Sequence, residues 1–427
     1  MKEHMKKRIL YIGYNFSPEL TGIGKYSGEM MEWLAQSGHD CSVITSYPYY
    51  PQWEVQEPYV KNRYWFLKET TNYPSGGRLT VYRCPMYVPK QPSGLTRILS
   101  DFSFFASALL QIMTFCCKKK YTHVISVAPT FLAGVLGAFY KKIKKANHLH
   151  HIQDLQIEAA AELGMIKSKP LLNILFRVEN FVFNNSQNIS SISDAMIKRI
   201  SKKTKRDVAF LPNWADTDFF YPIPNNDDLK VKFGFKPDDT TVLYSGGIGE
   251  KQGLENILFA AQSLLGQPKV KIIICGSGPY KEILKKKAIE MQLQNIYFMP
   301  LQPKENFNEF LNMADIHLVI QKKNASDLVM PSKLTTILAV GGAALVTANE
   351  GTDLHNIVSK YDMGYLIEAE NRDALTAGIV HLTQTANLCT IKKNAHGYAK
   401  EFLNINTVMK SLDQKLLQDL NYQCSLS

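Results

Sequence analysis

The sequence has few of the features that mark secreted or metal-stapled proteins. Its seven cysteines are odd in number, scattered along 427 residues and never spaced as Cys-x-x-Cys. This pattern is typical of a reducing compartment and argues against a disulfide framework or a zinc site. The first apolar run, Ile9–Tyr14, meets Asn15 and Pro18 too soon for a signal peptide. We therefore expect a buried first strand and a cytoplasmic protein.

Acidic residues are scarce relative to basic ones. The chain has 38 Asp and Glu against 49 Lys and Arg, which gives a formal net charge of +11. A basic protein attracts nucleic acid, an anionic membrane or phosphorylated small molecules. No zinc-finger, helix-turn-helix or RNP pattern accompanies the lysine clusters, so nucleic acid is not an expected partner.

What the chain does have is a regular alternation of strand-like and helix-like segments. Alternation in two runs predicts an α/β fold with two doubly wound parallel sheets, in domains 1–206 and 207–395. A helical segment, 396–427, is expected to pack back on the first domain. Ligands of such sheets bind beyond the carboxyl ends of the strands, so the expected site is a cleft between two facing Rossmann-like domains. Strands are expected at 8–14, 41–46, 79–84, 123–128, 148–153 and 207–211, then at 241–246, 270–275, 295–299, 315–320 and 343–347.

The most distinctive stretch is a glycine-rich turn between the strand expected at 241–246 and a helix expected at 253–265. It contains Gly247 and Gly249, and Lys251 adds a positive charge. Glycines let a ligand approach the backbone, and the amides at a helix start attract anions. The turn predicts a phosphate site, although an ordinary tight connection has the same pattern.

Two further loops repeat this pattern. Gly22 and Gly24 follow the first strand and precede a helix, and Gly276-Ser-Gly-Pro279 follows the strand at 270–275. Backbone in both loops can approach a phosphate or a sugar. For the first loop, a flexible connection remains the alternative.

The helix expected at 332–340 starts in an unusual way. Ser332 is a potential N-cap, and Lys333 lies in the first turn, where a cation is unfavourable for the helix dipole. We infer that an anion, here a phosphate, lies near Lys333. Glu350, after the strand at 343–347, can accept hydrogen bonds from sugar or ribose hydroxyls.

A histidine-rich strand, His148-Leu-His-His-Ile-Gln-Asp154, is the main candidate on the acceptor side. Alternation sends His148 and His150 to one face and His151 to the other, so a metal site is not expected. Asp154 lies just past the strand, where it can orient a hydroxyl, with His151 as the second candidate. Capping of the next helix is the alternative role of Asp154. Asp216-Thr-Asp218 is interpreted as a turn and not as a metal motif.

A long apolar helix is expected within 95–117. From Phe102 to Cys117 its polar side chains form a narrow stripe of Ser103, Ser107, Gln111 and Thr114. Its apolar run is shorter than the roughly 20 residues that cross a bilayer. We expect partial burial with peripheral contact to an anionic membrane near its basic end, with complete burial as the alternative. The aromatic stretch 47–53 fits either stacking on sugars or a packed lid.

Together these pieces resemble a retaining GT-B glycosyltransferase of family 4, over residues 7 to about 415. Within that family, Tyr49-Tyr-Pro-Gln-Trp53 and His151-Ile-Gln-Asp154 resemble the fucosyltransferase-like subgroup of colanic acid assembly. The matching segments are Pro18–Gly24, Leu211-Pro-Asn213, Ser245–Gly253, Gly276–Pro279, Pro331–Leu334 and Glu350-Gly351.

The resemblance implies a nucleotide-sugar donor held by the second domain, an acceptor held by the first, retention of configuration and no metal cofactor. Lys251 and Lys333 would stabilise the departing diphosphate, and Asp154 and His151 would act at the acceptor. The donor-binding residues that it implies are Gly22, Gly24, Asn213, Gly247, Gly249, Gly276, Gly278, Pro279, Ser332, Leu334 and Glu350.

One departure from the family pattern affects the donor site. Many members have a Glu-x7-Glu pair, but this chain has Leu328 and Thr336 at the two positions. Asp327, next to the first position, is the expected replacement. Without this pair, a reduced transferase activity is an open alternative.

The sequence therefore predicts a membrane-associated transferase at the inner face of the plasma membrane. It would move a hexose, with fucose from GDP-fucose as one candidate, to a lipid-diphosphate-linked saccharide during exopolysaccharide or capsule biosynthesis. A nucleotide-sugar epimerase on the same fold and a non-catalytic nucleotide-sugar-binding subunit are the alternatives.

Overall fold

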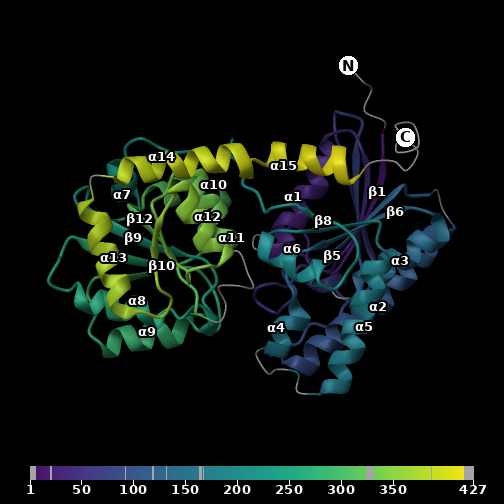
Figure 1. Ribbon diagram of the computed structural model, residues 1–427, viewed down its shortest axis with the longest axis horizontal. Helices are drawn as coiled ribbons and strands as arrows, with labels where there is room; N and C mark the ends of the chain where they lie inside the picture. The colour runs from purple at the N-terminus through teal and green to yellow at the C-terminus, as the bar shows by residue number, and fades with distance from the viewer. Residues whose placement is uncertain are drawn as a thin grey trace. The chain divides into compact units, whose positions relative to one another are not determined.

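The computed structural model describes residues 6–19, 22–91, 93–117, 120–130, 132–162, 166, 168–323, 331–385 and 387–417. The chain forms two compact units, each with its own sheet (Figure 1). One unit contains the chain up to Pro212 together with the segment from Met409 onward, and the other is Asn213–Val408.

The first unit contains an eight-stranded sheet in the order β3-β4-β2-β1-β5-β6-β7-β8. Neighbouring strands are parallel except for β3, which is antiparallel to β4. The strands are β1 (Arg8–Ile12), β2 (Asp40–Thr45), β3 (Leu67–Asn72), β4 (Arg78–Arg83), β5 (His123–Ala128), β6 (Asn147–Ile152), β7 (Asn188–Ser191) and β8 (Val208–Phe210). The helices are α1 (Gly22–Gln36), η1 (Tyr59–Asn62), α2 (Gly94–Cys116), α3 (Ala133–Lys144), α4 (Gln156–Glu162), α5 (Lys169–Asn185) and α6 (Asp194–Ser201).

The second unit contains a six-stranded parallel sheet in the order β11-β10-β9-β12-β13-β14. Its strands are β9 (Thr240–Ser245), β10 (Val270–Cys275), β11 (Ile296–Met299), β12 (Ile316–Val319), β13 (Ala344–Thr347) and β14 (Tyr365–Ile367). Its helical elements are α7 (Asp227–Lys232), η2 (Glu250–Gln252), α8 (Glu255–Ser263), α9 (Lys281–Glu290), α10 (Lys304–Asn312), α11 (Ser332–Ala339), α12 (Asp353–Tyr361), α13 (Arg372–Gln384), α14 (Leu388–Tyr398) and η4 (Ala399–Leu403). The chain continues with α15 (Ile405–Ser411) and η5 (Leu412–Leu416).

Alternate residues of the second sheet enter two separate hydrophobic cores. Val242 and Tyr244 of β9 pack with α8, α9 and α13, whereas Leu243 packs with α10, α11, α12 and α14. This is the pattern expected when a parallel sheet is covered on both faces. The prediction of two doubly wound α/β domains is confirmed.

Three observations go beyond the expected organisation. The edge strand β3 was not predicted because its sequence, Leu-Lys-Glu-Thr-Thr-Asn, is mostly polar. Strand β7 was also not predicted, because it has only one large apolar residue. The strand expected to open the second domain, β8, pairs with β7 in the first sheet. Of the terminal segment 396–427, which was expected to pack on the first domain, residues 396–408 belong to the second unit and the residues from Met409 belong to the first.

Candidate anion site and the family of the chain

The second sheet changes direction between β9 and β12. From β9 the chain winds outward through β10 to β11, and it then returns to the opposite side of β9 with β12. Loops that leave two such strands diverge at their carboxyl ends, which makes this position the usual ligand site of a doubly wound sheet. The first glycine loop, Gly246–Gly249, follows β9, and α11 is the first α-helix after β12 among the described residues.

The second glycine loop, Gly276–Pro279, supports the first. The Gly246 and Ile248 amides donate to Cys275 O (3.0 Å) and Ser277 O (2.8 Å). A Cβ at Gly276 would lie 1.9 Å from Gly246 O, and one at Gly278 would lie 2.1 Å from Ile248 O. Both residues must therefore be glycine for the two loops to pack backbone against backbone. Pro279 is exposed at the end of this loop.

Lys333 reaches the first glycine loop from the start of α11. Its Nζ is buried and has no hydrogen-bond partner among the residues that the structure describes. The same Nζ lies 3.0 Å from the position that a Cβ would take at Gly246, so a side chain there would crowd the ammonium. Burial lowers the pKa of Lys333 to about 7. A buried cation without a partner is costly, and an anion bound at the loop would supply the missing partner.

Tyr244, at the end of β9, contacts both parts of this arrangement. Lys333 Nζ lies 3.6 Å from the centre of the Tyr244 ring, which is a cation–π contact. The Tyr244 hydroxyl donates to Gly247 O at 2.7 Å. No sequence pattern singles out this tyrosine, since an aromatic residue inside an apolar strand usually has only a packing role.

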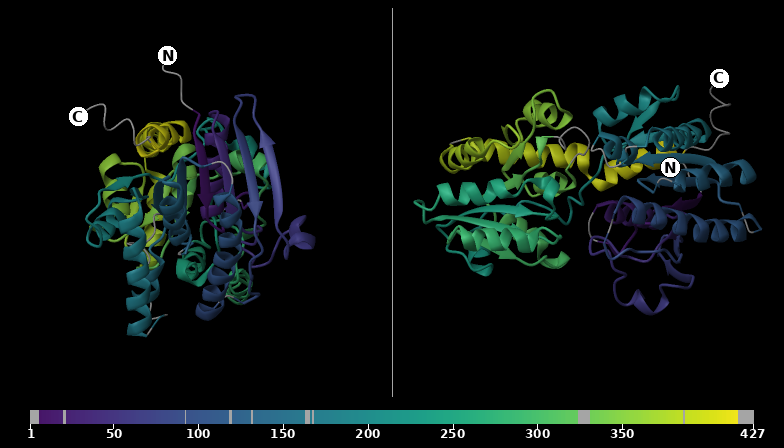
Figure 2. Two further views of the ribbon diagram at one scale, coloured as in Figure 1. Left: turned by 90° about the vertical axis from the view of Figure 1, so that its right-hand side faces the viewer. Right: turned by 90° about the horizontal axis from the view of Figure 1, so that it is seen from below.

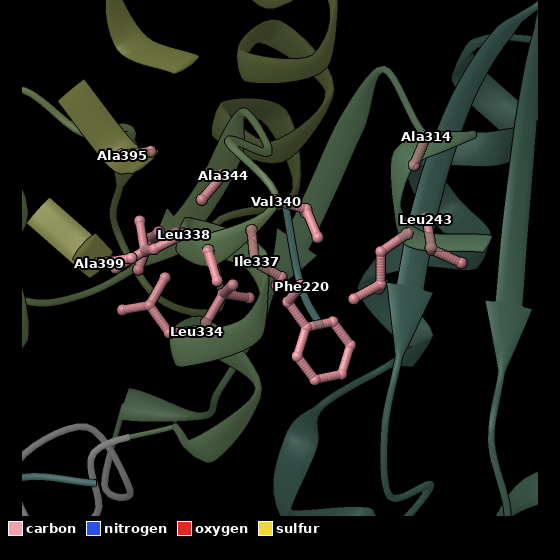
Figure 3. Close-up of a cluster of buried hydrophobic side chains, with 14 of the residues drawn as sticks. Phe220, Leu243, Ala314, Leu334, Ile337, Leu338, Val340, Ala344, Ala395 and Ala399 are labelled. Atoms are coloured by element: carbon pink, nitrogen blue, oxygen red, sulfur yellow. The ribbon is translucent and has the colours of Figure 1, made fainter. Parts of the chain in front are cut away.

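The helix that carries Lys333 differs from the expectation at its cap. Pro331 occupies the N-cap position and Ser332 is the first helical residue, so the prediction that Ser332 caps α11 is wrong. Leu334 is buried in the core beside Leu338 and Ala399 (Figure 3). Its amide donates to Pro331 O at 3.0 Å, so both its side chain and its amide already have structural roles.

The remaining candidates for donor binding differ in how far they are buried. Asn213 is buried, and its Oδ1 has no hydrogen-bond partner in the described part of the chain. Glu350 is exposed before α12. The backbone of Lys251 belongs to η2, but its side chain lies outside the described residues, as does the whole of Asp327. Thr336, at the second position of the missing carboxylate pair, donates to Lys333 O at 3.0 Å.

In the first unit, the loop after β1 is organised by a buried carboxylate. Glu19 accepts hydrogen bonds from Asn15 Nδ2 (2.9 Å) and from the amides of Tyr49 and Tyr50 (both 3.1 Å). A Cβ at Gly24 would lie 2.4 Å from Glu19 Oε2, whereas one at Gly22 would meet nothing within 4 Å. Gly24 thus makes room for Glu19, and both glycines lie in the first turn of α1.

The aromatic stretch after β2 is mainly packed. Tyr49 makes edge contacts with Tyr14 and Trp53, and the Arg97 guanidinium lies 5.2 Å from the Trp53 ring. Tyr47 and Tyr49 are buried, whereas Tyr50 remains exposed. The packed lid is therefore the better description of this stretch.

The histidines of β6 face in alternate directions, as predicted. Ser126 Oγ bonds both His148 Nε2 (2.7 Å) and His150 Nδ1 (2.8 Å), while His151 Nδ1 bonds Ser190 Oγ at 2.9 Å. His151 is 1% exposed, and burial lowers its pKa to about 3. It therefore lies inside the sheet layer, away from solvent.

Asp154 is half-buried beyond the end of β6 and lines a small cavity with His150, Pro129 and Glu179.

In the second unit, Asp216 accepts hydrogen bonds from the amides of Asp218 and Phe219 at 3.1 Å, as expected of a turn. Among the described residues, no group of three or more His, Cys, Asp or Glu side chains is arranged to hold a metal ion.

The long helix α2 exposes apolar side chains instead of its serines. Phe104, Ala108, Ile112 and Phe115 face the core, whereas Leu99, Phe102, Leu110 and Met113 are each more than half exposed. Ser107 is buried and donates to Phe104 O (3.0 Å), so the expected polar stripe is not the solvent-facing side. Helix α2 is long and apolar enough to cross a membrane by length and composition, although a third of its apolar window is buried. Figure 2 shows it as one uninterrupted helix.

Comparisons with known proteins identify the family. Residues 21–214 match the family described as "Glycosyl transferase 4-like domain", and residues 225–396 match "Glycosyl transferases group 1". The chain is 39% identical over 411 residues to WcaI of Escherichia coli (strain K12), which is named as a glycosyl transferase of colanic acid biosynthesis. That match covers 94% of this chain and 98% of WcaI. The chain belongs to the glycosyltransferase family.

Other glycosyltransferases share parts of the sequence or the fold. WbjE of Pseudomonas aeruginosa, which is named as a glycosyltransferase, is 24% identical over 50% of this chain and 54% of its own. A sucrose-phosphate synthase from Thermosynechococcus elongatus has a TM-score of 0.76 at 16% identity, over 99% of this chain and 100% of that chain. HepE of Anabaena, solved in complex with UDP and glucose, has a TM-score of 0.69 at 13% identity, over 96% and 99%. The fold of this glycosyltransferase is therefore the GT-B fold.

Proposed function

We propose that this glycosyltransferase moves a sugar from a nucleotide-sugar donor to a lipid-diphosphate-linked saccharide during exopolysaccharide or capsule biosynthesis, with retention of configuration. The colanic acid role in the name of WcaI, at 39% identity over nearly the whole chain, supports this class of product. Fucose from GDP-fucose is the donor that we propose to test first.

The observation that carries the proposal is the buried, unpartnered ammonium of Lys333 beside the first glycine loop. A nucleotide sugar leaves a nucleoside diphosphate whose terminal phosphate gains negative charge as the bond to the sugar breaks. An ammonium and loop amides held in position before the reaction stabilise that charge without reorganising. Lys251, four residues beyond Gly247, is proposed as the second cation.

The proposed reaction exchanges two bonds at the anomeric carbon. The bond from that carbon to the diphosphate oxygen breaks, and a bond to the acceptor oxygen forms on the same face of the sugar. The acceptor proton passes to the departing diphosphate oxygen, so no separate base is required. On the acceptor side, we assign Asp154 to orient the attacking hydroxyl. The deep burial of His151 makes it a structural residue in this scheme.

The test is sugar transfer to a fluorescent polyprenyl-diphosphate saccharide, with GDP-fucose first and other GDP- and UDP-sugars after it. Product with the α configuration from an α-linked donor, or β from a β-linked donor, supports transfer with retention. Conversion of the donor without acceptor would favour an epimerase. Nucleotide-sugar binding without turnover would favour a non-catalytic subunit.

We further propose that the protein is cytoplasmic and binds the inner face of the plasma membrane through the first unit. Helix α3 packs against both α2 and α5, and all three helices expose large apolar side chains, including Leu110, Ile143 and Ile174. Lys142 and Lys145 are exposed at the end of α3. Exposed apolar side chains beside lysines fit the headgroup region of an anionic bilayer.

Membrane binding is tested by sedimentation with vesicles that contain phosphatidylglycerol. Replacing Leu110 and Met113 together by Glu should abolish most of the binding, because both side chains would insert between lipids. Ile289→Glu, on α9 of the second unit, is the matched control, since Ile289 is 77% exposed. Equal sedimentation of the double variant and the control would contradict the proposal.

A further inference from the structure

Tyr244 has two separate contacts with the proposed diphosphate site, one through its ring and one through its hydroxyl. The ring faces Lys333 Nζ at 3.6 Å, and the hydroxyl donates to Gly247 O at 2.7 Å. Tyr244 is itself fully buried in the core between β9 and the helices α8, α9 and α13. Its position is therefore fixed by packing. Through its two contacts, it can hold both the lysine and the loop in place.

The hydroxyl contact determines the orientation of the loop. Burial raises the pKa of Tyr244, so the phenol keeps the proton that it donates to Gly247 O. The amide of the same peptide, Ile248 N–H, donates to Ser277 O at 2.8 Å, so the Gly247–Ile248 peptide is held on both sides. Gly246 O faces the second glycine loop at Gly276. Because the carbonyl and the amide of a trans peptide point in opposite directions, the Gly247 N–H points away from that loop.

The ring contact determines the position of the cation. Within the described residues, Lys333 Nζ has no hydrogen-bond partner. The face of an aromatic ring attracts an ammonium without using its three N–H donors. A lysine held in this way keeps all of its donors available for phosphate oxygens.

We propose that Tyr244 is the positioning residue of the donor diphosphate site: its ring holds the Lys333 ammonium while its hydroxyl anchors the Gly247 carbonyl, on the peptide that follows the Gly247 amide. This inference rests on the proposed function, since it assumes that the site binds a nucleoside diphosphate. In this assignment, one residue of β9 determines where the lysine ammonium and the glycine loop lie relative to each other. Tyr244 does not itself touch the ligand in this assignment.

The two contacts can be separated by mutation. Tyr244→Phe keeps the ring and removes the hydroxyl bond, whereas Tyr244→Leu removes both. The dissociation constants of GDP and UDP are measured by calorimetry for these variants, for Lys333→Met and for the two double variants. Leu284→Ala, in the same hydrophobic core but on α9, is the control for a general loss of packing.

Tyr244→Leu should weaken nucleotide binding about tenfold more when Lys333 is present than in the Lys333→Met background, because the ring acts through the lysine. Tyr244→Phe should weaken binding by a similar factor of a few in both backgrounds, because the hydroxyl acts on the loop. Leu284→Ala should have the same small effect in both. Thermal unfolding of each variant shows whether it is folded, and Tyr244→Phe keeps the test available if Tyr244→Leu is not.

The outcomes separate this inference from the proposed function. Equal effects of Tyr244→Leu in the two backgrounds, or no effect of Tyr244→Phe on affinity, would overturn the positioning role while the wild type still binds nucleotide. No binding of GDP or UDP by the folded wild type would contradict the proposed function, and the positioning role with it.

Discussion

At the scale of single residues, the ammonium of Lys333 lies in surroundings very different from those of a solvent-exposed lysine. Sequence reasoning could find it, because a lysine in the first turn of a helix conflicts with the helix dipole. Its contact with Tyr244 could not be found in this way. The ring and the ammonium are brought together by the return of the chain from β11 to β12. A local sequence pattern cannot predict this return.

The titration of Lys333 gives a prediction for the protein without ligand. Burial lowers its folded-state pKa to about 7, from 10.5. Between these values the unfolded chain binds more protons than the folded one, so the free energy of unfolding rises with pH in this window. Subtracting the stability of Lys333→Met from that of the wild type at each pH should show this rise. A difference that stays flat from pH 7 to 10.5 would place the ammonium in solvent.

Glu19 and Gly24 show a second limit of sequence reasoning. The motif that contains them was recognised, and its glycines were predicted to approach a ligand. In the structure Gly24 instead makes room for the Glu19 carboxylate, which ties the loop after β1 to the aromatic stretch after β2. A glycine in a loop has the same appearance in the sequence whether a ligand or a neighbouring side chain occupies the space beside it.

At the scale of elements, the packing of the two glycine loops predicts an asymmetry between neighbouring glycines. Gly278→Ala should lower the free energy of unfolding by about 1–3 kcal/mol, because its Cβ would overlap Ile248 O and its φ is +151°. Gly247→Ala should change stability by less than about 0.5 kcal/mol, since no atom of the described residues lies within 4 Å of the added Cβ. Chemical denaturation of the two variants measures both values, and equal losses would contradict the loop packing.

The segment after α15 is held to the first unit by a buried carboxylate. Asp413 Oδ1 lies 2.5 Å from Lys7 Nζ and 3.2 Å from His39 Nε2. Asp413→Asn should destabilise the protein by about 3 kcal/mol near neutral pH, since it leaves the partly buried Lys7 ammonium without its counter-charge. The exposed pair of Asp238 and Lys269 is the control, and Asp238→Asn should cause no measurable loss.

The same carboxylate predicts an acid dependence. The hydrogen bonds from His39 and Lys7 lower the pKa of Asp413 to about 2, although burial acts in the opposite direction. A lowered carboxyl pKa gives stability that is present above the unfolded value and is lost as the pH falls toward the folded value. The advantage of the wild type over Asp413→Asn should therefore disappear between about pH 4 and pH 2. A difference that is independent of pH would show that the contact is not ionic.

At the scale of the whole molecule, the parallel sheets were the most predictable feature. Buried parallel strands are continuous apolar runs, and those of β5 and β10 were placed at their observed bounds, His123–Ala128 and Val270–Cys275. The edge strand β3 and the end of the first sheet were missed, because a polar edge strand has no apolar run and because strand pairing is not visible in local sequence. The site candidates were found as separate motifs, whereas the contacts among them required the fold.

The most direct measurement is the dissociation constant of GDP and of UDP at pH 7, for the wild type and for Lys333→Met. If the buried ammonium binds the diphosphate, at least one nucleotide should bind the wild type at least tenfold more tightly than the variant, since a charged hydrogen bond contributes about 1.5–3 kcal/mol. Equal dissociation constants for the two folded proteins would contradict the assignment of Lys333 to the diphosphate.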